Sequence, residues 1–274
     1  MSDNAQPDNA QSDNARKVTL DFEGKIGVVR LNHPEVMNAV SAEMLEDFID
    51  VVDELGNSDA RCMLLTGNGR GFCAGANLQG RDDNDGNRPK KSGSVLRSGY
   101  HPLLFAIREL NMPVVTAVNG AAAGVGMSFA LMGDIVCASK KAFFLQAFAK
   151  IGLVPDGGST FMLPRLIGWA RAMELSMLAE RLPAEQAMEW GLINRLYDDN
   201  DALITGAMEM ANRLADGPKS LTLIRKAYWD SWQNSYEQQL DLEARLQNEA
   251  GSSADFKEGV SAFLEKRDAE FSGR

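Results

Sequence analysis

Residues 114–128 read Val114-Val115-Thr116-Ala117-Val118-Asn119-Gly120-Ala121-Ala122-Ala123-Gly124-Val125-Gly126-Met127-Ser128, and they decide the fold class. The first five are β-branched or apolar, which predicts a buried strand. The small residues that follow lead into an apolar helix at 129–132 and another strand at 135–138. A glycine-rich passage from strand to helix leaves backbone N–H groups at the helix N-terminus, where they can bind an anion. The stretch therefore predicts an alternating β/α fold with an anion-binding junction.

A second junction of the same kind precedes this one in the chain. The apolar strand Cys62-Met63-Leu64-Leu65-Thr66 is followed by Gly67-Asn68-Gly69-Arg70-Gly71-Phe72-Cys73-Ala74-Gly75-Ala76-Asn77-Leu78, a loop rich in glycine. Glycines allow the N–H groups of a loop to approach a ligand closely. Either junction alone is also consistent with tight packing in an α/β core. As a pair, they predict two N–H donors that converge on one oxyanion.

A single acid, Asp156, lies in the stretch Ile151-Gly152-Leu153-Val154-Pro155-Asp156-Gly157-Gly158-Ser159-Thr160. It stands between an apolar run and a Gly-Gly pair that leads into a predicted helix at 161–169, which indicates a strand-to-helix corner. Two interpretations of its carboxylate are open. It could cap the N-terminus of that helix, since Asp is a favoured capping residue. Alternatively, it could be a catalytic acid that faces a pocket.

The other segments predict strands near the N-terminus and helices near the C-terminus. Alternating apolar residues predict a hairpin of strands at 18–22 and 26–31, followed by a helix that is capped by Ser41 and stops at Gly56. The polar residues 80–99 are expected to form a mobile loop that closes over a ligand. We therefore expect a disordered polar tail at 1–16, an α/β core at 17–200 and a helical section at 201–274.

Composition excludes several classes of partner. The 274 residues carry 28 Lys and Arg against 38 Asp and Glu, a formal charge of -10, so neither nucleic acid nor an anionic membrane is expected to bind. No apolar run is long enough to span a membrane and no signal or transit peptide is recognisable, so we expect a cytoplasmic protein. The three cysteines do not form a metal-binding set, and no metal is expected. Cys73, in the glycine-rich loop, is left open as a nucleophile.

Together with the two junctions and the Asp156 stretch, the string Ala262-Phe263-Leu264-Glu265-Lys266-Arg267 resembles the enoyl-CoA hydratase/isomerase family, also called the crotonase superfamily. The resemblance extends over residues 18–270, and the segment 146–156 is similar to that of the phenylacetate-pathway isomerases. It implies a crotonase-like spiral of ββα repeats and a C-terminal section for oligomerisation and for covering coenzyme A. A homotrimer or a dimer of trimers is also implied. The implied ligand is an acyl-CoA thioester, with no separate cofactor.

The resemblance also assigns residues to a site. The backbone N–H groups of Ala76 and Val125 would hold the thioester oxygen, and Asp156 would be the catalytic acid. Phe263 and Lys266 of the last helix would reach coenzyme A on a neighbouring subunit. The full set of implied substrate or CoA contacts is Met37, Asn38, Ala39, Ala74, Gly75, Ala76, Asn77, Leu78, Gly124, Val125, Phe148, Pro155, Phe263 and Lys266.

The chain departs from the hydratases of that family. Ser128 and Phe148 stand where those enzymes have two glutamates, and neither can exchange protons with water as a carboxylate does. Asp156 alone suffices to move a double bond from a 3-enoyl-CoA to a 2-enoyl-CoA, or for a related ring-type isomerisation, while the N–H pair holds the enolate. An apolar wall of Phe144, Phe148 and Phe161 is expected to raise the pKa of Asp156.

Other activities remain open from the sequence. One is hydration with a non-standard acid or base. A dehalogenase-like hydrolase of aryl-CoA would use Asp156 as nucleophile and His101 to activate water, but Phe148 replaces the Trp expected beside that nucleophile. A non-enzymatic relative would bind acyl-CoA or RNA, and the negative charge disfavours RNA. The segment 126–130 is similar to the nucleophile elbow of a hydrolase, but both histidines precede Ser128 and that fold needs one after it.

Overall fold

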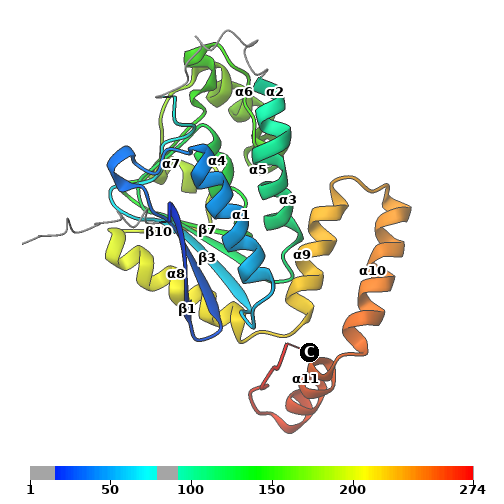
Figure 1. The fold of residues 1–274 in the computed structure, drawn as a ribbon. Helices are drawn as coiled ribbons and strands as arrows, with labels where there is room; N and C mark the ends of the chain where they lie inside the picture. The colour runs from blue at the N-terminus through cyan, green and yellow to red at the C-terminus, as the bar shows by residue number, and fades with distance from the viewer. Residues whose placement is uncertain (1–15, 79–91, 274) are drawn as a thin grey trace, which may run out of the picture.

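A computed structural model of the chain describes residues 16–78 and 92–273 (Figure 1). The predicted tail, apart from Arg16, lies outside the described residues, as do residues 80–91 of the predicted 80–99 loop. The remainder of that loop, 92–99, is helical. Within the described ranges, no helix is both long and apolar enough to cross a bilayer.

A six-stranded sheet forms the centre of the described chain. Its strands are β1 (Val18–Glu23), β2 (Ile26–Leu31), β3 (Cys62–Gly67), β5 (Val114–Val118), β7 (Ile135–Ser139) and β10 (Arg195–Tyr197). They lie side by side in the order β1-β2-β3-β5-β7-β10. β1 and β2 form the predicted antiparallel hairpin, and each later pair is parallel. Successive side chains point to opposite faces, so both faces of the sheet can be buried.

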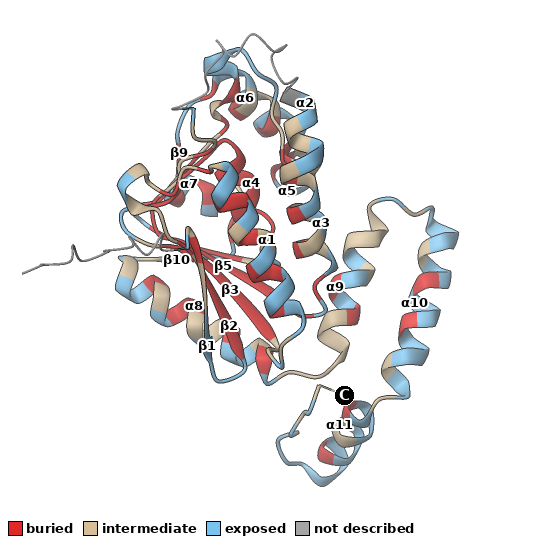
Figure 2. Cartoon of the chain, in the orientation of Figure 1, coloured by how far each residue is buried: buried red, intermediate tan, exposed pale blue. Residues whose placement is uncertain are grey.

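Helices cover the two faces of this sheet. On one face, α8 (Asn200–Ala215) packs through Leu203 and Ala207. The opposite face carries the main core, to which α1 (Ala42–Gly56) and α3 (His101–Glu109) contribute. Figure 2 shows the buried strands of the sheet in red between these helices and α8. Although α8 begins the predicted 201–274 section, it is packed as part of the core.

A second sheet, four-stranded in the described part of the chain, is built from shorter strands. These are β4 (Gly71–Cys73), β6 (Ala121–Ala123), β8 (Phe143–Leu145) and β9 (Leu182–Pro183), in that order. β4 follows β3 in the chain, β6 follows β5, β8 follows β7, and helical segments come after each pair. This succession of two strands and a helix confirms the predicted spiral of ββα units.

The glycine-rich stretch that ends at Ser128 differs in detail from its prediction. Its three alanines form β6, and the following helix, α4, spans Val125–Ala130 rather than 129–132. α4 starts early because Gly124, with φ of 53° and ψ of -128°, turns the chain directly from β6 into the helix. The N-terminus of α4 therefore lies at Val125, the predicted donor.

The last three helices leave the core as an arm (Figure 1). α9 (Ser220–Ser231) and α10 (Tyr236–Gly251) pack against each other, and α11 (Ala254–Glu265) follows at the end of α10. Exposed apolar side chains such as Tyr228 and Phe263 lie on this arm. Further helical segments are η1 (Pro34–Val36), α2 (Ser92–Val95), η2 (Leu96–Tyr100), η3 (Ala147–Ile151), α5 (Ser159–Ile167), α6 (Trp169–Leu178) and α7 (Ala184–Glu189).

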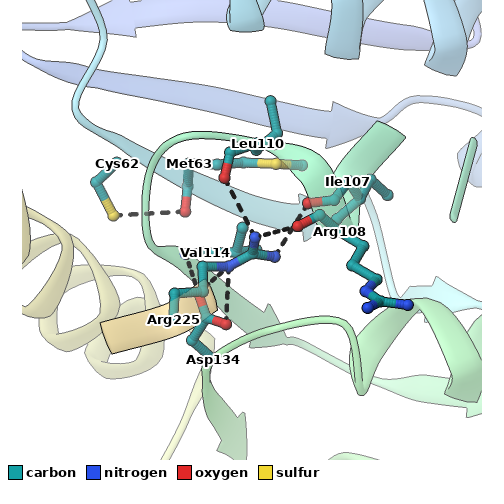
Figure 3. A network of polar contacts seen from close by, with 8 residues as sticks. All are labelled: Cys62, Met63, Ile107, Arg108, Leu110, Val114, Asp134 and Arg225. Atoms are coloured by element: carbon teal, nitrogen blue, oxygen red, sulfur yellow. Dashed lines mark hydrogen bonds and ion pairs between the residues drawn. The ribbon is translucent and has the colours of Figure 1, made fainter. Parts of the chain in front are cut away.

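Arg225 of α9 connects the arm to the core through an ion pair and hydrogen bonds (Figure 3). Its Nε lies 2.8 Å from Oδ2 of Asp134, and burial raises the pKa of Asp134 while the charge of Arg225 opposes that rise. Asp134 also accepts a hydrogen bond of 2.8 Å from the N–H of Val114, where β5 begins. The guanidinium donates in addition to carbonyl oxygens at the end of α3, which are those of Ile107, Arg108 and Leu110.

Candidate active site

The two glycine junctions meet in space. Gly75 has a φ of 99° and Gly124 a φ of 53°, values that glycine adopts without strain. A Cβ on Gly75 would lie 2.9 Å from the carbonyl oxygen of Ala123, and a Cβ on Gly124 would lie 3.9 Å from Cα of Gly75. The two backbones therefore touch where a side chain at residue 75 has no room. This contact brings the next residues, Ala76 and Val125, close together.

Both predicted donors have backbone surroundings that fit their assignment. Val125 is the first residue of α4, and the N–H groups of a first helical turn have no carbonyl partner inside the helix. Ala76 forms a parallel bridge with Val40, in which Val40 N donates to Gly75 O at 2.7 Å and Asn77 N donates to Val40 O at 2.8 Å. In such a bridge, the residue between the two bonds directs its own N–H to the opposite side. The N–H of Ala76 therefore points away from Val40.

Asn38 holds the first junction in shape. Its side chain is fully buried, and its Oδ1 accepts a hydrogen bond of 2.8 Å from the N–H of His33. Its Nδ2 lies 3.0, 2.9 and 3.1 Å from the carbonyl oxygens of Asn68, Gly71 and Phe72. The amide is thus fully used inside the protein. The predicted contact between Asn38 and coenzyme A would have to come from its main chain.

Asp156 does not cap a helix with its side chain. The N-cap residue of α5 is Gly158, without a side-chain capping bond, and the chain reaches Asp156 from the 3-10 helix η3 rather than from a strand. The main-chain carbonyl of Asp156 accepts a hydrogen bond of 3.2 Å from Ser159 N, whereas its buried Oδ1 has no hydrogen-bond partner among the described residues. The capping interpretation and the predicted strand-to-helix corner are therefore wrong, and within the described part of the chain Oδ1 of Asp156 is left for other chemistry.

The surroundings of Asp156 change its affinity for protons. Burial raises the pKa of its carboxyl group from 3.8 to about 6, and the positive charge of His101 opposes this rise. His101 is the first residue of α3, so this electrostatic interaction places the start of α3 near Asp156. A carboxyl group with this pKa is mostly ionised at neutral pH and holds a proton more tightly than an ordinary aspartate.

One member of the predicted aromatic wall borders the glycine junction. Phe148 is buried, and its Cζ would lie 3.8 Å from a Cβ on Gly124. Phe144 is fully buried in the main core. Phe161 instead packs edge-on against Trp232, the residue that follows α9, with the ring centroids 5.3 Å apart. The structure therefore brings Phe148 to the junction and gives Phe161 a partner in the arm.

Cys73 lies on β4 and does not have the properties of a nucleophile. Its side chain is fully buried, and burial raises the pKa of its thiol to about 12. Because the thiolate is the reactive form, this cysteine is inert at neutral pH, and the nucleophile hypothesis for Cys73 is wrong. The described residues also contain no cluster of three His, Cys, Asp or Glu side chains that could hold a metal ion.

The other predicted contacts fall into two places. Met37 lies beside the first junction, because its carbonyl oxygen accepts a hydrogen bond of 2.9 Å from Ala74 N. Phe263 lies on α11 with 82% of its surface exposed, and Lys266 follows at the end of that helix. Figure 1 shows α11 far from α4 of the same chain. Within one chain, Phe263 and Lys266 therefore lie away from α4, and their contacts with coenzyme A on a neighbouring subunit stay a prediction.

Two further polar residues lie behind Asp156, and the sequence did not mark them as site residues. Ser159 and Gln146 are both fully buried. Ser159 Oγ lies 2.8 Å from the carbonyl oxygen of Asp156 and 3.4 Å from Oε1 of Gln146. Serine is common at the start of any helix, so its position in the sequence alone did not indicate a role in the site.

Comparison with known proteins identifies the family of this chain. The sequence pattern of the family described as Enoyl-CoA hydratase/isomerase matches residues 21–274. The chain belongs to the enoyl-CoA hydratase/isomerase family. The predicted family and its crotonase-like fold are therefore confirmed.

Relatives within the enoyl-CoA hydratase/isomerase family carry both kinds of activity in their names. A 1,2-epoxyphenylacetyl-CoA isomerase of Escherichia coli K12 is 46% identical, over 92% of this chain and 97% of that protein. A Rhodobacter capsulatus protein named "Probable enoyl-CoA hydratase" is 45% identical, over 91% and 95% of the two chains. The crystal structure of an enoyl-CoA hydratase from Polaromonas sp. JS666 has a TM-score of 0.87 and 33% identity, over 93% and 99% of the two chains. Family membership alone therefore does not decide between isomerisation and hydration.

Proposed function

We propose that this chain shifts a double bond in an enoyl-CoA thioester, or carries out a related ring-type isomerisation, with Asp156 as its single acid and base. The observation that carries the proposal is the buried Oδ1 of Asp156, which lacks a hydrogen-bond partner among the described residues. A buried carboxylate oxygen without a partner is costly to stability. Such groups are therefore concentrated at functional sites, where a substrate completes their surroundings.

Each group of the site has a defined task in this reaction. The N–H groups of Ala76 and Val125 would bind the thioester oxygen and stabilise the negative charge that develops on it. Asp156 would then take a proton from C2 of a 3-enoyl group, which leaves a dienolate. The same carboxyl group would return the proton to C4. One C–H bond breaks, another forms, and the double bond moves from C3=C4 to C2=C3 without a further reactant.

The surroundings of Ser128 and Phe148 favour isomerisation over hydration. Ser128 is fully buried, and its hydroxyl donates a hydrogen bond of 3.0 Å to the main-chain oxygen of Asp156. Phe148 offers only a ring beside the junction. Neither residue supplies the second carboxylate that addition of water by the usual pair of glutamates requires.

Dehalogenase-like hydrolysis of an aryl-CoA is a second candidate, because the charge of His101 acts on Asp156. In that reaction the Asp156 carboxylate would attack the ring, and His101 would activate the water that releases the product. Halide release from a halogenated aryl-CoA would support this activity. Absence of halide together with rapid isomerisation of a 3-enoyl-CoA would exclude it.

The variant Asp156→Asn tests the proposed function, because it keeps the shape of the side chain and removes its acid. We expect kcat/KM for aliphatic and aromatic 3-enoyl-CoA substrates to fall by at least about 100-fold. The Kd for a 2-enoyl-CoA product should stay within about twofold of the wild-type value, since the N–H donors are unchanged. Near-normal turnover by the variant would refute the role of Asp156. Rapid hydration of crotonyl-CoA by the wild type would show that another residue acts on water.

A further inference from the structure

Hydrogen-bond donors converge on the main-chain carbonyl oxygen of Asp156. Ser128 Oγ lies 3.0 Å from this oxygen, Ser159 Oγ lies 2.8 Å from it, and Ser159 N lies 3.2 Å from it. Both serine side chains are fully buried, as is Gln146, whose Oε1 is 3.4 Å from Ser159 Oγ. A carbonyl oxygen has two lone pairs, so this one is saturated. The turn is therefore held firmly by its backbone, while Oδ1 of the same residue has no partner among the described residues.

The two serines come from the two helices that flank the site. Ser159 begins α5, whereas Ser128 lies on α4, three residues after the donor Val125. Residues three apart share one face of a helix. Gly157 rests on that face, because a Cβ added to it would lie 2.6 Å from Cβ of Ser128 and 3.4 Å from Cγ2 of Val125. The turn that carries Asp156 is thus seated on the side of α4 that starts with the N–H donor.

We propose that Ser128 is a positioning residue that fixes the Asp156 carboxylate relative to the N–H of Val125. The inference rests on the proposed function, in which these two groups act on the same substrate. Its hydroxyl proton is committed to the Asp156 main chain, so Ser128 does not exchange protons with the substrate. It acts through Asp156, by joining the helix that holds the thioester oxygen to the residue that moves the proton.

Such a role follows from the demands of proton transfer. The carboxylate oxygen must reach both C2 and C4 of a substrate whose carbonyl is fixed at α4. A displacement of a reacting group by about 1 Å can reduce a rate by about 100-fold. Gly157, with a φ of 61°, allows the turn to approach α4 but does not by itself hold it there. The hydroxyl of Ser128 supplies a directional link at this contact.

The test compares three serine-to-alanine variants in the full chain, with a 3-enoyl-CoA as substrate. Ser128→Ala removes the hydrogen bond from α4 to the main-chain oxygen of Asp156, and Ser159→Ala removes the side-chain hydrogen bond from α5 to the same oxygen. Ser139→Ala is the matched control, since Ser139 on β7 is also fully buried but its Oγ has no partner among the described residues. For each variant, the melting temperature, kcat, KM and the dependence of kcat/KM on pH are measured.

For Ser128→Ala we expect kcat to fall about tenfold and KM to change by less than about twofold. The acid limb of the pH profile should move from about 6 toward 3.8, because a loosened turn lets the carboxylate reach water. Ser128→Cys, which keeps a weak donor of similar shape, should recover part of the loss. Ser139→Ala should retain the wild-type kcat, KM and pH profile, and its melting temperature should not fall, because the variant removes a buried hydroxyl without a partner among the described residues.

A Ser128→Ala enzyme with wild-type kcat, or with an unchanged acid limb, would overturn the positioning role. If that variant does not fold, Ser128→Cys is judged by the same two criteria, because its weaker donor should still lower kcat and move the acid limb. These results are separate from the test of the proposed function. Inactive Asp156→Asn together with fully active Ser128→Ala refutes only the positioning role, whereas active Asp156→Asn refutes the proposed function itself.

Discussion

The loop that contains Asn38 and the turn that contains Asp156 each hold a buried polar group, the whole side chain of Asn38 and Oδ1 of the half-buried Asp156, but they differ in what these groups bind. The amide of Asn38 has partners on both its oxygen and its nitrogen, at distances of 2.8 to 3.1 Å. In the Asp156 turn, donors bind the main-chain carbonyl, while Oδ1 has none among the described residues. A polar group with every partner in place stabilises the fold, whereas a buried group without one is available to a ligand.

This difference separates two residues that the family resemblance placed in the same site. Asn38 was predicted as a contact of coenzyme A and Asp156 as the acid, and the sequence alone gives no way to see that one amide is consumed by its own chain. The distinction comes from the hydrogen bonds, which are a property of the folded backbone. Three predictions test whether these roles are as distinct as the hydrogen bonds indicate.

The largest effect on stability is expected from Asn38→Ala. The variant leaves the N–H of His33 and the facing carbonyl oxygens without their buried partner, so we expect the free energy of unfolding to fall by about 3 kcal/mol. Urea denaturation measures this change. Asn212→Ala is the control, because this exposed asparagine on α8 makes one hydrogen bond of 3.1 Å to a carbonyl of its own helix. If Asn38→Ala and Asn212→Ala lower the free energy of unfolding equally, the structural role of Asn38 is refuted.

A smaller effect of opposite sign is expected when Asp156 is replaced by Asn. The pKa of Asp156 is about 6 in the folded state and 3.8 without burial, so the folded protein binds the proton more tightly between these values. The stability that Asp156 contributes is thus present at low pH and is lost as the pH rises through about 6. We expect Asp156→Asn to be more stable than the wild type by about 1 kcal/mol at neutral pH.

Urea denaturation at several pH values measures this difference, which should shrink as the pH falls toward 3.8. The wild type serves as its own reference at each pH, because only it carries the titrating group. If Asp156→Asn is instead less stable at neutral pH, the carboxylate has a stabilising partner and the contrast with Asn38 fails.

The smallest effect is expected from His101→Gln, which removes the charge that lowers the pKa of Asp156. For the wild type, kcat/KM should rise with pH to a plateau above about 6, because Asp156 must be ionised to take the first proton. In the variant, this acid limb should move to higher pH by less than about one unit. A rate profile measured across the limb detects the shift. An unmoved limb would show that His101 does not act on the carboxylate.

The elements that the sequence predicted well are those set by local pattern. The hairpin of β1 and β2 and the helix α1, which begins after Ser41 and ends at Gly56, follow from alternation, periodicity and a cap. β6 was missed because alanine has little strand preference, and its pairing with β4 and β8 decides its conformation. Elements whose conformation depends on distant partners were therefore beyond the reach of sequence pattern.

The candidate site, like the fold, could be predicted from the sequence only where local pattern or the family resemblance determines it. Glycine spacing indicated two N–H junctions, and the resemblance assigned Ala76, Val125 and Asp156. The failure of Asp156 as a cap depends on Gly158, whose φ of 82° starts α5 without a side-chain bond. The role of Ser159 depends on where the carbonyl of Asp156 points. Both are set by backbone directions that residue types alone do not specify.

Arg225 bears on whether the arm can be treated as an exchangeable module. A chain cut after α8 would retain every described strand, yet Asp134 would lose its counter-charge and the end of α3 would lose its donor. Loss of one partner of a fully buried ion pair typically costs about 3 to 5 kcal/mol. The cost here should be smaller, because 24% of the Asp134 side chain is exposed. Asp134 also binds Val114, the first residue of the strand that leads to Val125. A chimera that exchanged arms between relatives would therefore have to keep Arg225 and the partners of its side chain together. Otherwise it would disturb the strand that leads to the active site.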